Sequence, residues 1–490
     1  MAKTLFKLSA MFDLMGGDGE ALIEWAKKAE RQQLIHEGVS QWDPKLHPVA
    51  DKGKRPDKQI FVPNGEKDAN GEDILVEDTA PVARVPMAIQ KYIINQKASF
   101  ARGSGVILRP SREGSTVYDR VQNNWRQNKT DFFLKEIATR MMAETQVAVI
   151  FYSPPQKTTA APSPDDFRLR FKIVSPLKGD KLTPIFDQDT GDLIAFGREY
   201  EVHETGRYDL YIMNREGFCE IHRYEGTKGK LSGLIDPKSA VRIDKIITPY
   251  TNLPVIYWEQ DLPECDDTKE LIEEFETAFS DFLTQMGYSA DPILFGKDTT
   301  LSMPAKGSPG KYVEGSADAN LEFVTPANAT ESRKLQFQML EKFIFTLNRS
   351  VKLDLDTMKE LGDVSGAALE RYLLEVYLEA TDRQQGPYGI GVQRMVNFML
   401  TVWKYIEGTD EDLTIDVEFQ RFSVTDVAER VALAMKSNGN KPVVDHETSI
   451  AIAGLVDDPA AALRKINEEN APPPIQEEEQ SSETPAPAEA

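Results

Sequence analysis

Apolar residues recur at helical spacing along the second half of the chain. Between Asp267 and Ala290 they define one face of a helix, and acidic residues occupy the other face. Such spacing predicts an amphipathic helix there and a second one over Asn328–Leu353, roughly 35–40 Å long. Residues 291–327 between them are rich in Gly and Pro, which predicts short extended pieces. In the second helix the apolar residues recur every four positions, at Leu335, Met339, Phe343, Leu347 and Val351.

A third helical run begins near Ser365, a residue suited to cap a helix. Gly386–Gly391 must kink or break this run, because Pro387 lacks a backbone donor and clashes with the preceding turn. The run resumes over Val392–Tyr405. The remaining C-terminal predictions are a strand over 413–422, helices over 425–436, 446–454 and 457–469, and a disordered Pro- and Glu-rich tail over 471–490.

The apolar period changes to two between Phe167 and Trp258. Apolar residues alternate with basic ones over Phe167–Ile173, which predicts a half-buried strand. Tyr208–Ile212 and Phe218–Tyr224 flank a turn and predict a hairpin. The block closes with the apolar strand Leu253–Trp258, so the whole pattern predicts an α+β fold.

The N-terminal part mixes helices with polar chain. We expect a helix near Glu20–Gln33, and no regular structure over Pro44–Asn70, which is rich in Pro, Gly and Asp. The basic residues of that segment are expected to be solvated rather than to contact nucleic acid. Further on, the spacing predicts helices over Val85–Arg102, ending at Gly103, and over Tyr118–Thr145, followed by a strand over Val147–Tyr152.

Composition and charge limit the function classes. The formal net charge is −22, to which the tail after Lys465 contributes seven glutamates without a cation. An acidic surface should not hold duplex DNA tightly, although DNA can slide past it. On charge alone, simple solubility is the favoured explanation. No apolar run is long enough to cross a membrane, and no signal peptide is expected. Cys219 and Cys265 cannot form a disulfide framework, and both are expected to be buried in a protein of a reducing compartment.

The motifs of catalysis are absent or incomplete. Phe295–Thr299 has the final Gly-Lys of a phosphate-binding loop, but Asp291 stands where the first Gly should be. Asp187–Asp192 resembles the start of a calcium loop without its distal Glu, and a hairpin turn is the better interpretation. The histidines lack metal-site spacing, and there is no nucleophile elbow. We therefore expect no enzyme, no metal and no cofactor.

Three passages, taken in order, are similar to those of one protein family. The apolar Leu253–Trp258 precedes a helix with the core Leu271–Asp281. Asp363–Glu370 contains Ser-Gly-Ala-Ala-Leu, and the strand 413–422 leads into a helix and an acidic tail. Together they resemble the portal proteins of tailed, double-stranded DNA phages, especially siphophages. The family often has Asp where Glu273 stands, and a more continuous helix at 386–391.

The resemblance implies a portal fold with an α/β wing, paired long stem helices, a small α/β clip, a long kinked helix and a helical C-terminal crown. The implied division is an N-terminal helix and polar loop (1–84), wing (85–266), first stem helix (267–290), clip (291–327), second stem helix (328–353), tunnel loop (354–364), kinked helix with return strand (365–424), crown (425–470) and tail (471–490).

The resemblance also implies a function and its partners. The chain would form a homo-oligomeric, dodecameric ring at the capsid portal vertex of the virion, after assembly in the host cytoplasm. Double-stranded DNA would pass through the ring during packaging and ejection. The implied protein partners are the terminase large subunit, the head–tail adaptor, the major capsid protein and scaffolding proteins, with no membrane.

Individual charged residues acquire roles from the same resemblance. In and beside the tunnel loop, the acidic residues would repel phosphate while the lysines make weak repeated contacts: these residues are Lys352, Asp354, Asp356, Lys359, Glu360 and Asp363. Lys297, Lys306 and Lys311 of the clip would present a positive rim to an acidic terminase or adaptor. For each lysine the alternative is an ordinary solvated surface charge.

Two other function classes stay open at this point. One is an enzyme acting on nucleic acid or nucleotides, which would need a metal or phosphate site. The other is a different phage structural protein, head-associated or from a baseplate. Ring stoichiometry separates the portal hypothesis from both, and loss of DNA packaging on altering residues 354–364 separates it from the second.

Overall fold

In the computed structural model of the chain, contacts group the residues into two compact units. One comprises Met1–Asp354 and Leu374–Phe422, and the other comprises Leu355–Leu373 and Ser423–Ala490. Each unit is described by itself. The structure describes residues 29–67, 73–154, 164–165, 167–186, 190–214, 218–225, 241–247, 253–289, 293–302, 312–324, 330–352, 371–421, 427–438, 444–456 and 459–470.

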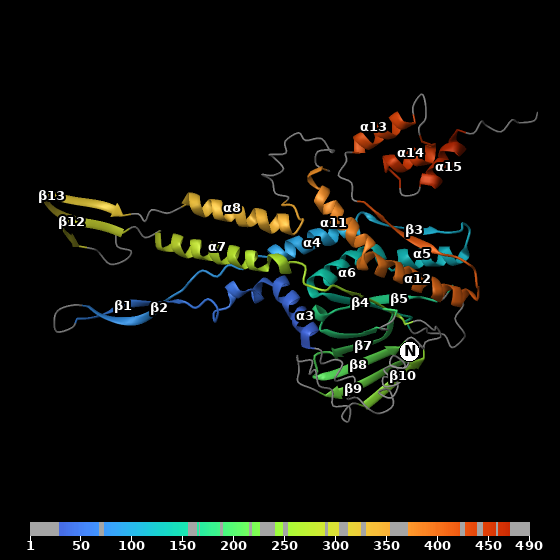
Figure 1. Ribbon diagram of the computed structural model, residues 1–490, viewed down its shortest axis with the longest axis horizontal. Helices are drawn as coiled ribbons and strands as arrows, with labels where there is room; N and C mark the ends of the chain where they lie inside the picture. The colour runs from blue at the N-terminus through green and yellow to red at the C-terminus, as the bar shows by residue number, and fades with distance from the viewer. Residues whose placement is uncertain are drawn as a thin grey trace, which may run out of the picture. The chain divides into compact units, whose positions relative to one another are not determined.

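The main core of the first unit forms between four helices and a small antiparallel sheet of strand order β11–β4–β5. Because β4 is covered on both faces, it reads as a continuous apolar run. The predicted strand at Val147–Tyr152 and the apolar closing strand are confirmed. The elements are α4 (Ile89–Arg102), α5 (Thr116–Gln127), α6 (Thr130–Glu144), α12 (Pro387–Glu407), β4 (Gln146–Tyr152), β5 (Arg170–Val174) and β11 (Val255–Glu259) (Figure 1).

A five-stranded antiparallel meander lies against the other face of this sheet. Ala148 and Ile150 of β4 pack there with Phe196 and Met213. The hairpin predicted around residue 215 is confirmed as β8 and β9, and β6 pairs antiparallel with β7 on either side of Asp187–Asp192. The strands are β6 (Asp180–Phe186), β7 (Leu193–Glu201), β8 (Arg207–Asn214), β9 (Phe218–Glu225) and β10 (Val241–Ile247), in the order β10–β9–β8–β7–β6.

The strand predicted at 413–422 is confirmed as β14 (Ile415–Gln420), which pairs antiparallel with β3 (Gly105–Pro110). The predicted helix end at Gly103 is also confirmed. Gly103 has φ +68°, and a Cβ there would overlap the carbonyl oxygen of Gln420. Only glycine fits this position, because it tolerates positive φ and has no side chain.

The single helix predicted over Tyr118–Thr145 is wrong. Two helices, α5 and α6, replace it, and Lys129 between them has a left-handed φ of 51°. The Thr130 hydroxyl donates to the carbonyl of Trp125 at 3.1 Å, which fixes the corner. The apolar period continues across the break because both helices bury their faces in the same core, so periodicity alone does not reveal it.

The expectation of an irregular segment over Pro44–Asn70 is also wrong. Strand β1 (Lys58–Lys67) pairs with β2 (Asp73–Ala80). Each strand contains an apolar, β-prone triplet, Ile60–Val62 in β1 and Ile74–Val76 in β2, and Val62 lies opposite Val76. The preceding helix α3 (Ala29–Trp42) runs nine residues past the predicted end at Gln33, and residues 20–28 lie outside the described part. Two short 3-10 turns follow it, η1 (Pro44–Leu46) and η2 (Pro48–Ala50).

The two long amphipathic helices predicted around the Gly/Pro stretch are confirmed as α7 (Lys269–Ser289) and α8 (Thr330–Leu347). They lie side by side, with the ring of Phe337 packed against Phe275, Phe279 and Phe282 (Figure 1). Helix α8 stops six residues before the predicted end, because Asn348 donates to the carbonyl of Ile344 at 2.8 Å and Arg349 turns to a φ of 48°.

Between α7 and α8, two extended pieces form a single hairpin of β12 (Ile293–Ser302) and β13 (Tyr312–Val324). No helix occurs in the described part of this region, where the portal resemblance implies a small α/β clip. The lookalike phosphate loop Phe295–Thr299 lies within β12, so it has the wrong local structure for a phosphate cradle.

The helical run after residue 365 breaks where proline predicts, but over a shorter stretch than expected. Residues 353–370 lie outside the described part. Helix α11 (Leu374–Gln385) ends before Gly386, and α12 resumes at Pro387 rather than at Val392. Proline suits the first helical position, because its missing donor has no partner there. Gly389 and Gly391 therefore lie inside α12.

The described part of the second unit contains the three C-terminal helices predicted from the sequence. These are α13 (Val427–Ser437), α14 (His446–Ala453) and α15 (Pro459–Glu469). Asp445 caps α14 by accepting from the Thr448 amide at 3.0 Å. Within the described residues, no helix combines the length and the apolar character needed to cross a bilayer.

Candidate functional site

The charged residues singled out from the sequence fall mostly outside the described part. Lys352 is described, and its Nζ pairs with Glu341 Oε1 at 2.8 Å. Lys297 lies on β12, opposite Asn320. The other seven lie outside the described residues and stay predictions: Asp354, Asp356, Lys359, Glu360, Asp363, Lys306 and Lys311. The described residues on either side of 353–370 are therefore the two points at which the structure bears on the predicted tunnel loop.

The first of these points is held by a side-chain amide. The Val351 amide donates to Gln96 Oε1 at 3.0 Å, and Gln96 Nε2 donates to the Val351 carbonyl at 2.8 Å. One residue of α4 thus satisfies both backbone groups of Val351, as a neighbouring strand would. Just before it, Asn348 donates to the Thr268 hydroxyl at 2.7 Å, so the end of α8 is tied to the start of α7.

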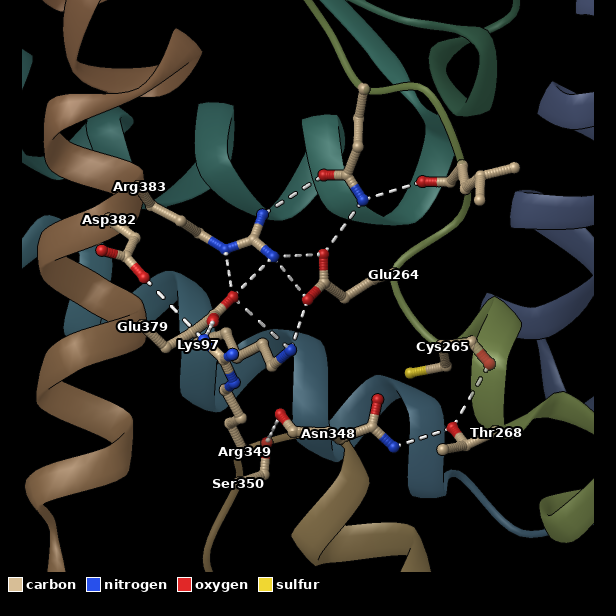
Figure 2. Close-up of polar contacts among 12 residues, drawn as sticks. Lys97, Glu264, Cys265, Thr268, Asn348, Arg349, Ser350, Glu379, Asp382 and Arg383 are labelled. Carbon is tan, nitrogen blue, oxygen red and sulfur yellow. Dashed lines mark hydrogen bonds and ion pairs between the residues drawn. The ribbon is translucent and has the colours of Figure 1, made fainter.

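The second point, α11, is held by a network of buried charges that we call the root network: Lys97, Glu264, Glu379 and Arg383. Figure 2 shows Arg383 between the two carboxylates. Its Nη2 lies 2.6 Å and 2.8 Å from the oxygens of Glu264 and 2.9 Å from Glu379 Oε1. The Lys97 Nζ lies 2.5 Å from Glu264 Oε1 and 3.8 Å from Glu379. Two cations therefore share two carboxylates.

The root network is enclosed by protein. The side chains of Lys97 and Glu264 are only 6% and 2% exposed. Burial by itself raises the pKa of Glu379, but Lys97 and Arg383 more than offset that effect and hold it below its usual value. Burial, with the charge of Glu264 adding to it, raises the pKa of the neighbouring Cys265 thiol to about 12. Cys265 is thus an inert buried thiol, as expected from the sequence.

The network joins both ends of residues 353–370. Arg349, just before the segment, places Nη1 3.4 Å from Glu379 Oε2 and 3.8 Å from Asp382 Oδ2 on α11. Gln260 adds a bond to Glu264 Oε2 at 3.0 Å. These contacts connect α4, the turn before α7, the end of α8 and α11. They offer no nucleophile or open coordination position, so their role is mechanical: they fix where the segment begins and ends.

Sequence reasoning missed the root network. Lys97, Glu264 and the Glu379–Arg383 pair are separated from one another by more than a hundred residues. Only that pair has a local signal, the i, i+4 spacing of opposite charges on a helix. Among the described residues, no cluster of three or more His, Cys, Asp or Glu side chains is arranged to hold a metal ion.

A second feature is an apolar stripe on α8, formed by Leu335, Met339, Phe343 and Leu347. These side chains are between 46% and 60% exposed. The face of α8 that packs on α7 is a different one, marked by Phe337 and the buried Ile344. The four-residue apolar repeat seen in the sequence therefore marks a surface that nothing in the described chain covers. An exposed row of large apolar side chains is typical of a protein–protein contact.

Comparison with known protein families identifies the chain. The family model described as phage portal protein, SPP1 Gp6-like, matches residues 65–472, which is most of the sequence. The chain belongs to this portal protein family. The resemblance drawn from the three sequence passages is confirmed. Portal proteins are structural and non-enzymatic, which agrees with the missing catalytic motifs.

Other comparisons add little to the family assignment of this portal protein. The search of curated proteins found no match. Among solved structures, the chain is similar to one titled "Neck of native GTA particle computed with C12 symmetry", with 9% sequence identity and a TM-score of 0.37. The match covers 75% of this chain and 89% of that chain. A similarity at this level does not support an assignment of fold or function.

The N-terminal segment of the portal protein is fastened to α7 by a buried histidine. His47 Nδ1 lies 2.7 Å from Glu276 Oε1, and its Nε2 lies 3.1 Å from the Gln41 carbonyl oxygen. The Met87 amide donates to the same Glu276 oxygen at 2.6 Å. A carboxylate and a carbonyl oxygen both accept, so this geometry suits the imidazolium form of His47, in which both ring nitrogens donate. We call this contact the His47 clasp.

The His47 clasp predicts a pH-dependent stability. Burial lowers the pKa of His47, but the hydrogen bond and charge of Glu276 outweigh it and raise the pKa above 6.5. Because the pKa of His47 is higher in the folded protein, its protonation stabilises the fold. This stabilisation is complete below the unfolded pKa of about 6.5 and is lost as the pH rises through the folded pKa.

We expect His47→Gln to remove that loss when the free energy of unfolding is measured by urea denaturation from pH 6 to 9. The exposed His36, changed to Gln, is the matched control for loss of an imidazole and should change the free energy of unfolding by less than about 0.5 kcal/mol at pH 6. Equal profiles for His47→Gln and the wild type would contradict the clasp.

Proposed function

We propose that this chain is the portal subunit that forms a dodecameric ring at the capsid vertex, with a central channel for packaging and ejecting double-stranded DNA. Membership of the portal family supports the proposal. The structural observation that carries it is the apolar stripe of α8, which the described residues of a single subunit leave exposed. A stripe and a covering surface on different sides of one subunit give head-to-tail contacts, which close into a ring when the rotation allows.

In this proposal the paired helices α7 and α8 are the stem, β12–β13 belongs to the clip and residues 354–364 are the tunnel loop. The tunnel loop carries more carboxylates than lysines. DNA phosphates would then meet repulsion from Asp354, Asp356, Glu360 and Asp363, and weak attraction from Lys352 and Lys359. Copies of such a loop around a channel would centre the duplex without trapping it. The root network would supply the rigid mount that each loop needs.

The clip is proposed to dock the terminase large subunit during packaging and the head–tail adaptor afterwards. Lys297, Lys306 and Lys311 would give it a positive rim on an otherwise acidic chain. Opposite charge at such a rim chiefly raises the association rate and selects the partner, and it adds little affinity. The wing would face the capsid and scaffolding proteins.

The proposal is tested by the mass of the assembled protein. Native mass spectrometry of the wild type should give twelve times the subunit mass of 55.0 kDa. Phe343→Glu places a charge in the stripe and should yield folded monomers instead of rings. Phe132→Glu puts the same charge on an exposed phenylalanine of α6 and is the matched control, which should still form rings. A wild type that stays monomeric at high concentration would contradict the ring.

The channel is tested with assembled rings in a DNA packaging reaction. Rings carrying Lys359→Glu should keep their mass and package DNA more slowly, since a weak contact becomes a repulsion. Unchanged packaging by variants throughout 354–364 would remove the tunnel loop from the mechanism, while ring formation would still stand.

A further inference from the structure

The β1–β2 hairpin exposes apolar side chains that nothing in the described chain covers. Phe61 and Leu75 are 64% and 56% exposed, and Ile74 and Val76 are exposed as well. Phe61 faces Glu77 across the two strands, and Pro63 faces Leu75. Because side chains alternate along a strand, Phe61, Leu75 and Glu77 share one face. An isolated two-stranded hairpin is marginal in water, so this apolar face calls for a covering surface.

The extended chain that leads from the hairpin follows α7 in a regular register. The amides of Met87, Val85 and Ala83 donate to Glu276, Ser280 and Thr284 at 2.6, 3.1 and 3.0 Å. Two residues of extended chain and four residues of helix span nearly the same length, roughly 6–7 Å. The hairpin therefore begins at the C-terminal end of α7 (Figure 1), which is also the end at which α8 starts.

The hairpin and the apolar stripe of α8 lie on different sides of α7. The three α7 residues that bind residues 83–87 lie about 130° around the helix from the phenylalanines that hold α8, at 100° per residue. A hairpin leaving one side of the subunit cannot cover a stripe on the other side of the same subunit without crossing α7. It is well placed to cover the stripe of a neighbour related by rotation, as in a head-to-tail contact.

The charges of the two surfaces are complementary. Glu77 lies on the hairpin face of Phe61, and the adjacent Asp78 is exposed too. On α8, Lys334 precedes Leu335 and Lys342 precedes Phe343; both lysines are exposed, and neither forms an ion pair within the described residues. The hairpin face thus carries an acidic residue beside its apolar side chains, and α8 carries lysines beside its stripe, together with Glu331 and Glu341.

From these observations we propose that the β1–β2 hairpin of each subunit packs on α8 of the neighbouring copy, with Phe61 and Leu75 against Leu335 and Met339 and with Glu77 near Lys334. This contact rests on the proposed ring and assigns one arm of its interface to a segment without a role in the sequence analysis. Each hairpin gains the apolar partner that it lacks in its own subunit, and each stripe is covered at its N-terminal half.

Disulfide trapping in full-length protein tests the contact. In a Cys219→Ser background, Phe61→Cys together with Met339→Cys should give covalent oligomers up to the full ring under mild oxidation. Cys265 is fully buried and will not interfere. Each single cysteine variant is a control and should give no ladder. Dimers from Phe61→Cys alone would mean that hairpins pair with each other, and rings that form without a ladder in the double variant would also overturn the contact while leaving the ring intact.

A charge exchange gives an independent readout. Glu77→Lys should weaken ring assembly by about fivefold, as expected for one rim ion pair at its upper strength. Adding Lys334→Glu should restore assembly. No recovery in the double variant would overturn the pairing. If the wild type forms no rings at all, the proposed function and the hairpin contact both fail, a result distinct from rings that assemble without the contact.

Discussion

Replacing Glu264 by alanine is expected to destabilise the fold by about 3–5 kcal/mol, because it strands two cations. Lys97 is almost fully buried and would lose its partner at 2.5 Å, and Arg383 would lose both of its bonds to Glu264. Glu379 alone would then face both cations. Urea denaturation followed by circular dichroism measures the change in the free energy of unfolding.

The matched control for Glu264→Ala is Glu375→Ala on α11. Glu375 is exposed and takes no part in the root network, so its loss should change the unfolding free energy by less than about 0.5 kcal/mol. Glu264→Gln keeps the shape of the side chain and removes only the charge, so it separates packing from electrostatics. If Glu264→Ala changed the free energy of unfolding as little as Glu375→Ala, the root network would contribute nothing to the stability of the fold.

Gly391→Ala is expected to destabilise the core by about 3 kcal/mol, the upper end of the usual range for overpacking. A methyl group on Gly391 would overlap the indole of Trp258, including its Nε1. Trp258 is 1% exposed and donates to the Tyr388 carbonyl at 3.1 Å, so it has no free space to enter. The expected result is a lower unfolding midpoint together with a shifted tryptophan emission.

Gly287→Ala is the control for that substitution, since it makes the same change inside a helix with open space around the Cβ. It should stabilise α7 by about 0.5–1 kcal/mol, because glycine is the poorer helix former. Equal effects at the two positions would show that helix propensity, and not the contact with Trp258, decides the outcome at Gly391.

The elements that could be predicted are those with a strong local period. Helices α4, α7 and α12 and the β8–β9 hairpin carry their own apolar pattern and their own stop signals, such as Gly103 and Pro387. The misses are also local in origin. The corner at Lys129 interrupts no apolar period, and the β1–β2 triplets are hidden in a polar segment. The apolar period shows which face of a helix is buried. It does not reveal a break between two helices that bury the same face.

The site could not be predicted, because its residues meet only through the fold. Nothing near Lys97 in the sequence indicates that Glu264 and Arg383 lie beside it, and a charged residue read alone is most often solvated. The apolar repeat of α8 was visible, but the sequence does not say whether its own chain covers that face. The structure answers this question: α7 packs against Phe337 and Ile344 instead.

The paired bonds between Gln96 and Val351 give residues 353–370 a fixed point of departure, and Arg349 links that point to α11. The helices on either side of the segment are thus tied to each other independently of it. In the proposed ring, each copy would then follow the passing duplex on its own, one ahead of or behind the next. Coordination around the channel would come from the helical pitch of the DNA, and it would require no signal passed from subunit to subunit.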